Sequence, residues 1–295
     1  MNQYKFLLMT CALGLTLSTK SLAGTLSVDG NLADWGLFTS TTNPQTWIPQ
    51  GSQNCTTASN CFLHNGLTIY YAVEDYLGGD GGRVYPGYGG QAYDAEALYV
   101  TLDADNLYIA LVTGHDPNTK QQGNNYAAGD FALNFWSGAH PDSNYEFGIQ
   151  TPHQSNNIGL FSTNVYQTTN DNWLKDPFWN TGAVTSLNTT GLTPLGKQAA
   201  MSIQPGPAAI GDGPGPHWIY EISVAKSVFG DAFEQNTDLN ISWTMNCAND
   251  TILVEDDIPT IDEPPVWALL GLTLPAVFWR RRHLSRAGAS SFQRW

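Results

Sequence analysis

The sequence predicts an all-β protein built as a single antiparallel β-sandwich of jelly-roll type. Tyr, Trp, Thr, Val and Ile are plentiful, and 29 Gly and 16 Pro residues punctuate the chain throughout. Two β-rich runs, Ala97–Leu102 and Leu107–Thr113, flank the tetrapeptide Asp103–Asn106. Apolar residues alternate along the second run almost without charge, so we expect a hairpin covered on both faces and lying inside the sheet.

Three segments make up the chain in this interpretation. Residues 1–23 form a signal helix, residues 24–255 the sandwich, and residues 256–295 an acidic stalk followed by a sorting or anchor segment with a short transmembrane helix. The middle segment suits one large domain, because no linker, charge run or internal repeat divides it.

Before the hairpin, Asp29-Gly30 predicts a turn, Trp35 a core residue and Leu67–Glu74 a strand, and the glycine-rich Gly78–Gly90 predicts a loop. After it, the expected strands are Asp130–Trp136, Tyr145–Thr151, Ile158–Gln167, Lys197–Ile203, His217–Val224 and Asn240–Asn246. The first three of these form a meander. Ala225–Phe229 predicts one helical turn that ends at Gly230, and Asp250–Asp262 predicts the acidic stalk.

The N-terminus has the pattern of a secretory signal. Lys5 precedes the apolar run Phe6–Leu17, and Ser21-Leu22-Ala23 supplies the small residues that a signal peptidase reads, so the mature chain would begin near Gly24. The alternative, a lipoprotein lipidated at Cys11, suits its Leu-Met-Thr-Cys context poorly.

A second processing signal lies at the C-terminus, where the apolar run Val266–Trp279 follows Asp262–Pro265. Its 14 residues would span roughly 21 Å as a helix, short of a hydrocarbon core of about 30 Å. The arginines that follow would stay cytoplasmic and leave the domain outside the membrane.

This tail resembles the PEP-CTERM sorting signal of Gram-negative bacteria, although Asp262 stands where the first proline is usual. The resemblance rests on Glu263, Pro264, Arg280, Arg281 and Arg282. It implies transient anchoring in the inner membrane, removal of the tail by an exosortase-type protease, and delivery to the cell surface or an exopolysaccharide matrix. A plain C-terminal membrane anchor is the alternative.

Charge narrows the range of partners. The segment from Gly24 to Glu263 holds all 26 acidic residues but five basic ones, a formal net charge of −21. Such a surface repels phosphate backbones, so nucleic-acid binding is excluded, whereas divalent cations would be attracted.

Cysteine use fits an exported protein. Cys55 and Cys61 would close a short polar loop by a disulfide in an oxidising compartment. Cys247 is then left as a buried thiol, with pairing to either loop cysteine as the alternative.

The opening Asp29-Gly30 with Asp34-Trp35 is similar to the start of family 9 carbohydrate-binding modules and related DOMON-like sandwiches. Five later motifs follow in a fixed order: Tyr93–Tyr99, Leu107–Gly114, Gly129–Leu133, Tyr145–Gly148 and Trp243–Asp250. This order resembles the ectodomain of a group of PEP-CTERM proteins, which implies the fold but no activity.

The sequence contains no hydrolase elbow, metalloprotease motif or phosphate-binding loop, so we expect a non-catalytic protein. The single cofactor considered is a structural calcium near the hairpin, where oxygen ligands gather. Its candidate ligands are Asp75, Asp80, Asp94 and Glu96. Asp103 and Asp105 are better explained as an ordinary turn.

Sugar rings stack on aromatic side chains, and loops commonly present binding residues. The candidate carbohydrate-binding residues are Tyr85, Tyr88, Trp173, Trp179 and Trp218. The expected function is therefore carbohydrate or matrix binding at the cell surface. The alternatives are a structural or adhesive surface protein without a small ligand, and a secreted glycoside-active enzyme.

Overall fold

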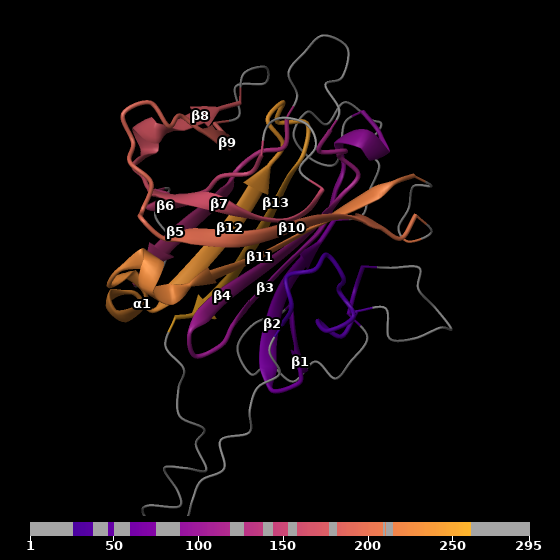
Figure 1. The fold of residues 1–295 in the computed structure, drawn as a ribbon, viewed down its shortest axis with the longest axis horizontal. Coiled ribbons are helices and arrows are strands. Elements are labelled where there is room, and N and C mark those ends of the chain that lie inside the picture. Colours follow the sequence, from indigo (N-terminus) through magenta and orange to yellow (C-terminus); the bar gives the residue numbers. More distant parts are fainter. Residues whose placement is uncertain are drawn as a thin grey trace, which may run out of the picture.

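The computed structural model describes residues 26–37, 47–49, 60–74, 89–118, 127–137, 144–152, 158–176, 182–208, 210 and 215–260. These residues confirm the all-β class. They form an antiparallel sheet that curls on itself, a two-stranded sheet, three 3-10 turns and the four-residue helix α1, Ala232–Gln235 (Figure 1). None of the helices in the described part of the chain has the length and hydrophobicity needed to cross a membrane.

The large sheet has eleven strands within the described residues. Its spatial order is β1-β2-β3-β4-β11-β10-β7-β6-β5-β12-β13. The bounds are β1 Cys61–His64, β2 Leu67–Val73, β3 Ala95–Leu102, β4 Asn106–Thr113, β5 Phe131–Trp136, β6 Phe147–Ile149, β7 Gly159–Gln167, β10 Gln198–Gly206, β11 His217–Ala225, β12 Asp238–Thr244 and β13 Thr251–Pro259. The small sheet pairs β8, Trp173–Lys175, with β9, Val184–Leu187.

The predicted hairpin is confirmed as β3 and β4. Both strands are buried along almost their whole length and lie inside the sheet between β2 and β11. Asp103 forms its turn, because Oδ1 accepts the backbone N–H of Asp105 at 2.8 Å and of Asn106 at 2.7 Å. These bonds are those of an ordinary Asx turn, as predicted.

The other expected strands are also present, and β5, β6 and β7 pair as the predicted meander. The helical turn is η3, Lys226–Phe229, and Gly230 ends it with φ of 58°. The prediction of an acidic stalk is wrong for residues 251–259, because they form β13. The sheet therefore continues past the expected boundary of the domain at residue 255. The two short strands β8 and β9 were not expected.

The curl of the sheet encloses the main core. β13 packs against β2 and β3, so the last strand meets the first strands without hydrogen-bonded pairing to them. Core residues come from both halves of the sheet, including Leu98, Tyr220 and Trp243, all fully buried.

A second core lies on the outer face of β2, β3, β4 and β11. Residues 26–37, the N-terminal strap, cover this face together with Trp47. Trp35 is buried, as predicted, and its Nε1–H donates to Glu221 at 2.6 Å. The carboxylate of Glu221 also accepts the backbone N–H of Gly30 at 2.5 Å, so it fixes the strap to the middle of β11.

The β8–β9 hairpin covers a third apolar cluster on the outer face of the other half of the sheet. Trp173 and Leu187 pack there on Ala132 of β5 and Tyr166 of β7. Gly148 of β6 lies beneath them, where a Cβ atom would come within 2.9 Å of the Trp173 ring. The outer face is therefore covered at two separate places.

Candidate functional site

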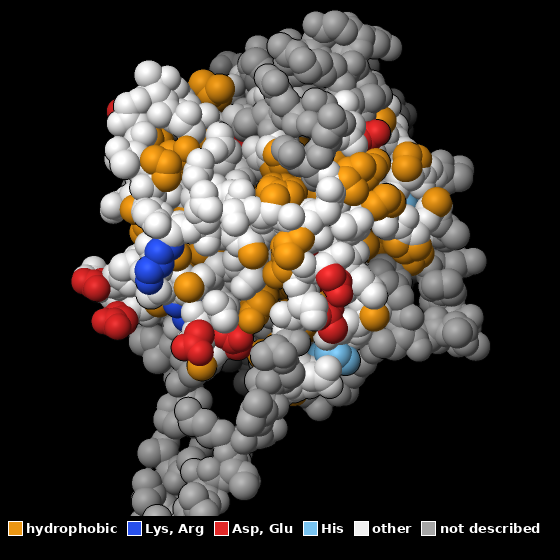
Figure 2. All heavy atoms as spheres, viewed as in Figure 1, with side chains coloured by type: hydrophobic (Ala, Val, Ile, Leu, Met, Phe, Trp, Pro, Cys, Tyr) orange, Lys and Arg blue, Asp and Glu red, His pale blue; other side chains and the backbone are white. Residues whose placement is uncertain are grey.

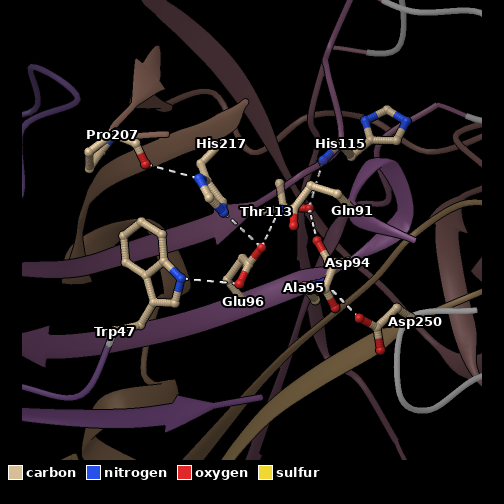
Figure 3. A network of polar contacts seen from close by, with 10 residues as sticks. All are labelled: Trp47, Gln91, Asp94, Ala95, Glu96, Thr113, His115, Pro207, His217 and Asp250. Carbon is tan, nitrogen blue, oxygen red and sulfur yellow. Dashed lines mark hydrogen bonds and ion pairs between the residues drawn. The ribbon is translucent and has the colours of Figure 1, made fainter. Parts of the chain in front are cut away.

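The densest group of buried polar side chains lies where β3 begins (Figure 3). We call it the β3-entrance cluster. Its ionisable members are Glu74, Asp94, Glu96, His217 and Asp250. Four of these five are fully buried, and Glu74 is partly buried.

Glu96 and His217 form the centre of one half of the cluster. His217 Nε2 lies 3.0 Å from Glu96 Oε1, an ion-pair contact without the alignment of a hydrogen bond. The Nε1–H of Trp47 donates to Glu96 Oε2 at 3.1 Å, and Gln91 Nε2 donates to Oε1. Trp47 also meets the His217 ring edge-on, at 5.1 Å between ring centroids.

These contacts indicate where the protons lie. His217 Nδ1 is 2.9 Å from the carbonyl oxygen of Pro207, which can only accept, so Nδ1 carries a proton. Glu96 accepts two N–H groups, which favours the ionised carboxylate. The imidazole of His217 is therefore held between the Pro207 carbonyl on its Nδ1 side and the Glu96 carboxyl group on its Nε2 side, away from solvent.

A β-bulge directs the Glu96 side chain toward His217 and Trp47. The register between β3 and β4 shifts between Ala95 and Ala97. Ala95 lies in the main core and Ala97 in the outer core, although residues two apart in a regular strand share a face. The extra residue in the bulge is Glu96, whose carboxylate meets Trp47 and His217.

Carboxyl groups make up the other half of the cluster. Asp250 Oδ2 accepts the backbone N–H of Ala95 at 2.6 Å, across the gap between β13 and β3. Burial raises the pKa of Asp250 well above its usual value, and the charge of Glu74 adds to this effect. Burial likewise raises the pKa of Glu74 to about 8, with a further contribution from Asp94. Close carboxyl groups in a dry site therefore favour the protonated form.

Gly114 makes the approach of Gln91 possible. Gln91 begins the 3-10 turn η1, Gln91–Tyr93. A Cβ atom at Gly114 would lie 1.6 Å from the carbonyl oxygen of Gln91, closer than any side chain allows. The glycine thus lets η1 pack on the end of β4 and hold the Gln91 amide against Glu96.

Two of the four predicted calcium ligands, Asp94 and Glu96, lie in the β3-entrance cluster. Glu96 faces His217, whereas Asp94 interacts with Glu74 and Asp250. Asp75 and Asp80 lie outside the described residues. In the part of the chain that the structure describes, no group of three or more His, Cys, Asp or Glu side chains is arranged to hold a metal ion.

Two of the predicted sugar-binding residues are in the interior. Trp173 is 5% exposed beneath the β8–β9 hairpin, and Trp218 is 8% exposed at the edge of the main core. Neither presents an open indole face on which a sugar ring could stack. Tyr85, Tyr88 and Trp179 lie outside the described residues.

Cys61 is disulfide-bonded, and Cys247 is a free, buried thiol, as predicted. Burial raises the pKa of Cys247 to about 11. Cys55 lies outside the described residues, as do the sorting residues Glu263, Pro264, Arg280, Arg281 and Arg282.

Sequence reasoning did not identify His217, Asp250 or Glu221 as members of polar networks. No spacing could have revealed them, because the contacts of Glu221 and Asp250 join residues 186 and 155 positions apart. The one usable signal was chemical: charged residues inside apolar strands, as in His217–Ala225, require buried partners.

Through buried or partly buried contacts, the cluster joins five parts of the fold: the segment around Trp47, η1, β3, β11 and the residue before β13. The geometry of the cluster is therefore that of a group that holds separate segments of the fold together. Comparison with known proteins adds no assignment, since no family model, curated protein or solved structure matches the chain.

Proposed function

We propose that the chain is an exported, non-catalytic protein of the cell surface or exopolysaccharide matrix that binds carbohydrate or matrix. In this proposal its curled sheet is a jelly-roll-like sandwich, residues 1–23 are a signal helix, and the C-terminal segment is a PEP-CTERM-like tail with a short membrane helix. An exosortase-type protease and a surface polysaccharide are the partners.

The observation that carries the proposal is the disulfide of Cys61. Disulfides persist in oxidising compartments outside the cytoplasm. The net charge of −21 between Gly24 and Glu263 supports the same location outside the cytoplasm, because it favours solubility and repels other polyanions.

A binding role is supported by where the reactive groups lie. Two carboxyl groups whose pKa burial raises, those of Asp250 and Glu221, accept N–H groups from distant segments of the chain. Groups used in this way stabilise the structure, which favours binding on a rigid scaffold over catalysis.

Export and sorting are tested by intact mass of the protein extracted from the surface of producing cells. The expected mass lacks residues 1–23 and the C-terminal tail, and it is lower by two hydrogen atoms for each disulfide. A full-length, reduced protein in the cytoplasmic fraction would overturn this part of the proposal.

Binding is tested by affinity electrophoresis of the purified mature domain in gels that contain soluble polysaccharides. Retardation by at least one polysaccharide is expected. An unchanged mobility in all gels would exclude binding to these polysaccharides and would favour the alternative of a structural or adhesive surface protein. Release of reducing sugar from any of them would instead support the glycoside-active enzyme.

A structural calcium is tested separately by thermal unfolding with calcium and with EDTA. An ion that binds the folded state raises its stability by mass action, so a calcium site predicts a higher Tm with calcium than with EDTA. Equal Tm values would remove calcium from the proposal.

A further inference from the structure

The turn between β1 and β2 carries the single Asn-Gly pair of the sequence, Asn65-Gly66. His64 pairs with Leu67 across the hairpin, so the loop between the strands has two residues. Asn65 has φ of 49° and Gly66 has φ of 81°, and positive values at both positions are those of a type I′ turn. Both turn residues are exposed. In Figure 2 a histidine side chain reaches the surface low on the face, where the β1–β2 turn lies in Figure 1.

The turn places a nucleophile next to an amide that can be displaced. The hydrogen bond of a β-turn joins its first and fourth residues, here His64 and Leu67, so it does not use the Gly66 N–H. Glycine also has no Cβ atom to shield this nitrogen. The side-chain nitrogen of Asn65 lies 2.9 Å from His64 Nε2 at an exposed position, from which ammonia can depart into solvent.

The backbone of the turn suits the cyclic product of such an attack. A five-membered ring through the Asn65 side chain and the Gly66 nitrogen holds Cβ and that nitrogen near one plane. Such a ring fixes ψ of Asn65 at about −120°, which with φ of about 60° is the first central position of a type II′ turn. Type II′ is the other common two-residue hairpin turn. Because Asn65 already has a positive φ, rotation of the peptide plane that follows it reaches this geometry without unpairing the strands.

We propose that Asn65 is a site of spontaneous deamidation in the folded protein. The Gly66 nitrogen, after losing its proton to hydroxide, forms a bond to Cγ of Asn65. The bond from Cγ to Nδ2 breaks, and Nδ2 takes a proton from water and leaves as ammonia. Water then opens the succinimide ring at either carbonyl group, so the products are aspartate and isoaspartate. The net reaction consumes one water, releases one ammonia and needs no other reactant.

The test follows the purified protein during incubation at pH 8.5 in water that carries heavy oxygen, by peptide mapping with mass spectrometry. We expect the Asn65 peptide to be replaced by aspartate and isoaspartate forms that each contain one heavy oxygen atom, while tryptophan fluorescence shows that the protein stays folded. Asn188 is an exposed asparagine within the same chain. Asn65 should convert at least about tenfold faster, because the side chain of Thr189 shields the nitrogen that would attack Asn188.

Gly66→Asn is the matched variant, because asparagine tolerates a positive φ but adds a Cβ atom beside the attacking nitrogen. It should keep the Tm and slow the conversion of Asn65 about tenfold. If Asn65 stays intact in the folded protein and converts only in urea, the hairpin prevents ring closure and the proposal is wrong. Conversion of Asn188 at the same rate as Asn65 would overturn it too, since exposure alone would then be sufficient. A conversion that Gly66→Asn does not slow would show that the Gly66 nitrogen is not the nucleophile.

Discussion

At the scale of single residues, Glu96 is a fully buried carboxyl group that lies 3.0 Å from the imidazole of His217. Removing one member of a buried pair leaves the other charge without compensation, which costs about 3–5 kcal/mol. We therefore expect His217→Ala to lower the free energy of unfolding by about that amount. Urea unfolding followed by tryptophan fluorescence measures the loss.

A double-mutant cycle separates the pair from simple loss of packing. Glu96→Gln with His217→Gln removes both charges, so its cost should be smaller than the sum of the single costs. His64→Ala is a control at a less buried histidine and should cost far less. Additive costs for the two substitutions would mean that the 3.0 Å contact contributes no coupling energy.

The partly buried carboxyl of Glu74 makes stability depend on pH. Burial raises its pKa from 4.5 to about 8, and that of Glu221 to about 7. The folded state thus holds protons that the unfolded state releases, so this contribution is fully present below pH 4.5 and is lost as pH rises to about 8. We expect the Tm to fall between pH 5 and pH 8.5 in a differential scanning series.

Glu74→Gln should flatten that decline, because glutamine cannot lose a proton. Glu234→Gln, at an exposed position on α1, should leave it unchanged. A Tm of the unmodified protein that rises across this range would contradict the assignment of raised pKa values to the cluster.

At the scale of elements, η1 depends on the absence of a side chain at Gly114. Gly114→Ala would place a Cβ atom 1.6 Å from the Gln91 carbonyl oxygen, so η1 must move and take the Gln91 amide away from Glu96. We expect a loss of at least 2 kcal/mol in chemical unfolding.

Gly196→Ala is the matched control, since its Cβ atom would meet nothing within 4 Å. It should change the free energy of unfolding by less than about 0.5 kcal/mol. Equal effects at the two glycines would show that η1 does not need its close packing on β4.

The end of the folded domain gives another prediction for an element. A chain that ends at Glu255 interrupts β13 and lacks Ile258, which is fully buried beside Leu239 of β12. A chain that ends at Thr260 keeps the whole strand. We expect the shorter chain to melt at least about 5 °C lower, given a loss of 2 kcal/mol or more. Equal Tm values would mean that the last residues of β13 add no stability.

Patterning along the sequence identified the interior strands, because burial on one face leaves a period of two and burial on both faces leaves a run almost without charge. The same reasoning failed at β13. Its sequence TILVEDDIP contains three acidic residues in a row, which we interpreted as a solvated stalk. An edge strand pairs on one side only, so it tolerates charges that a central strand would exclude.

At the scale of the whole molecule, the β3-entrance cluster could not be read from the sequence. The sequence indicated that Asp94 and Glu96 needed compensation, and it suggested a cation. In the structure, His217 of β11 lies against Glu96, and Asp250, just before β13, accepts the backbone N–H of Ala95. These partners depend on the closure of the sheet and on a bulge, which one-dimensional patterns do not encode.

The closure of the sheet also sets the order in which the molecule can form. β13 must pack against β2 and β3, and Asp250 bonds to a residue 155 positions earlier in the chain. Folding dominated by such distant contacts is slow, because the chain must close long loops before it gains stability. The main core therefore cannot be completed until the last strand has left the ribosome. Under the proposed export, this delay would keep the chain unfolded long enough to pass through a narrow channel.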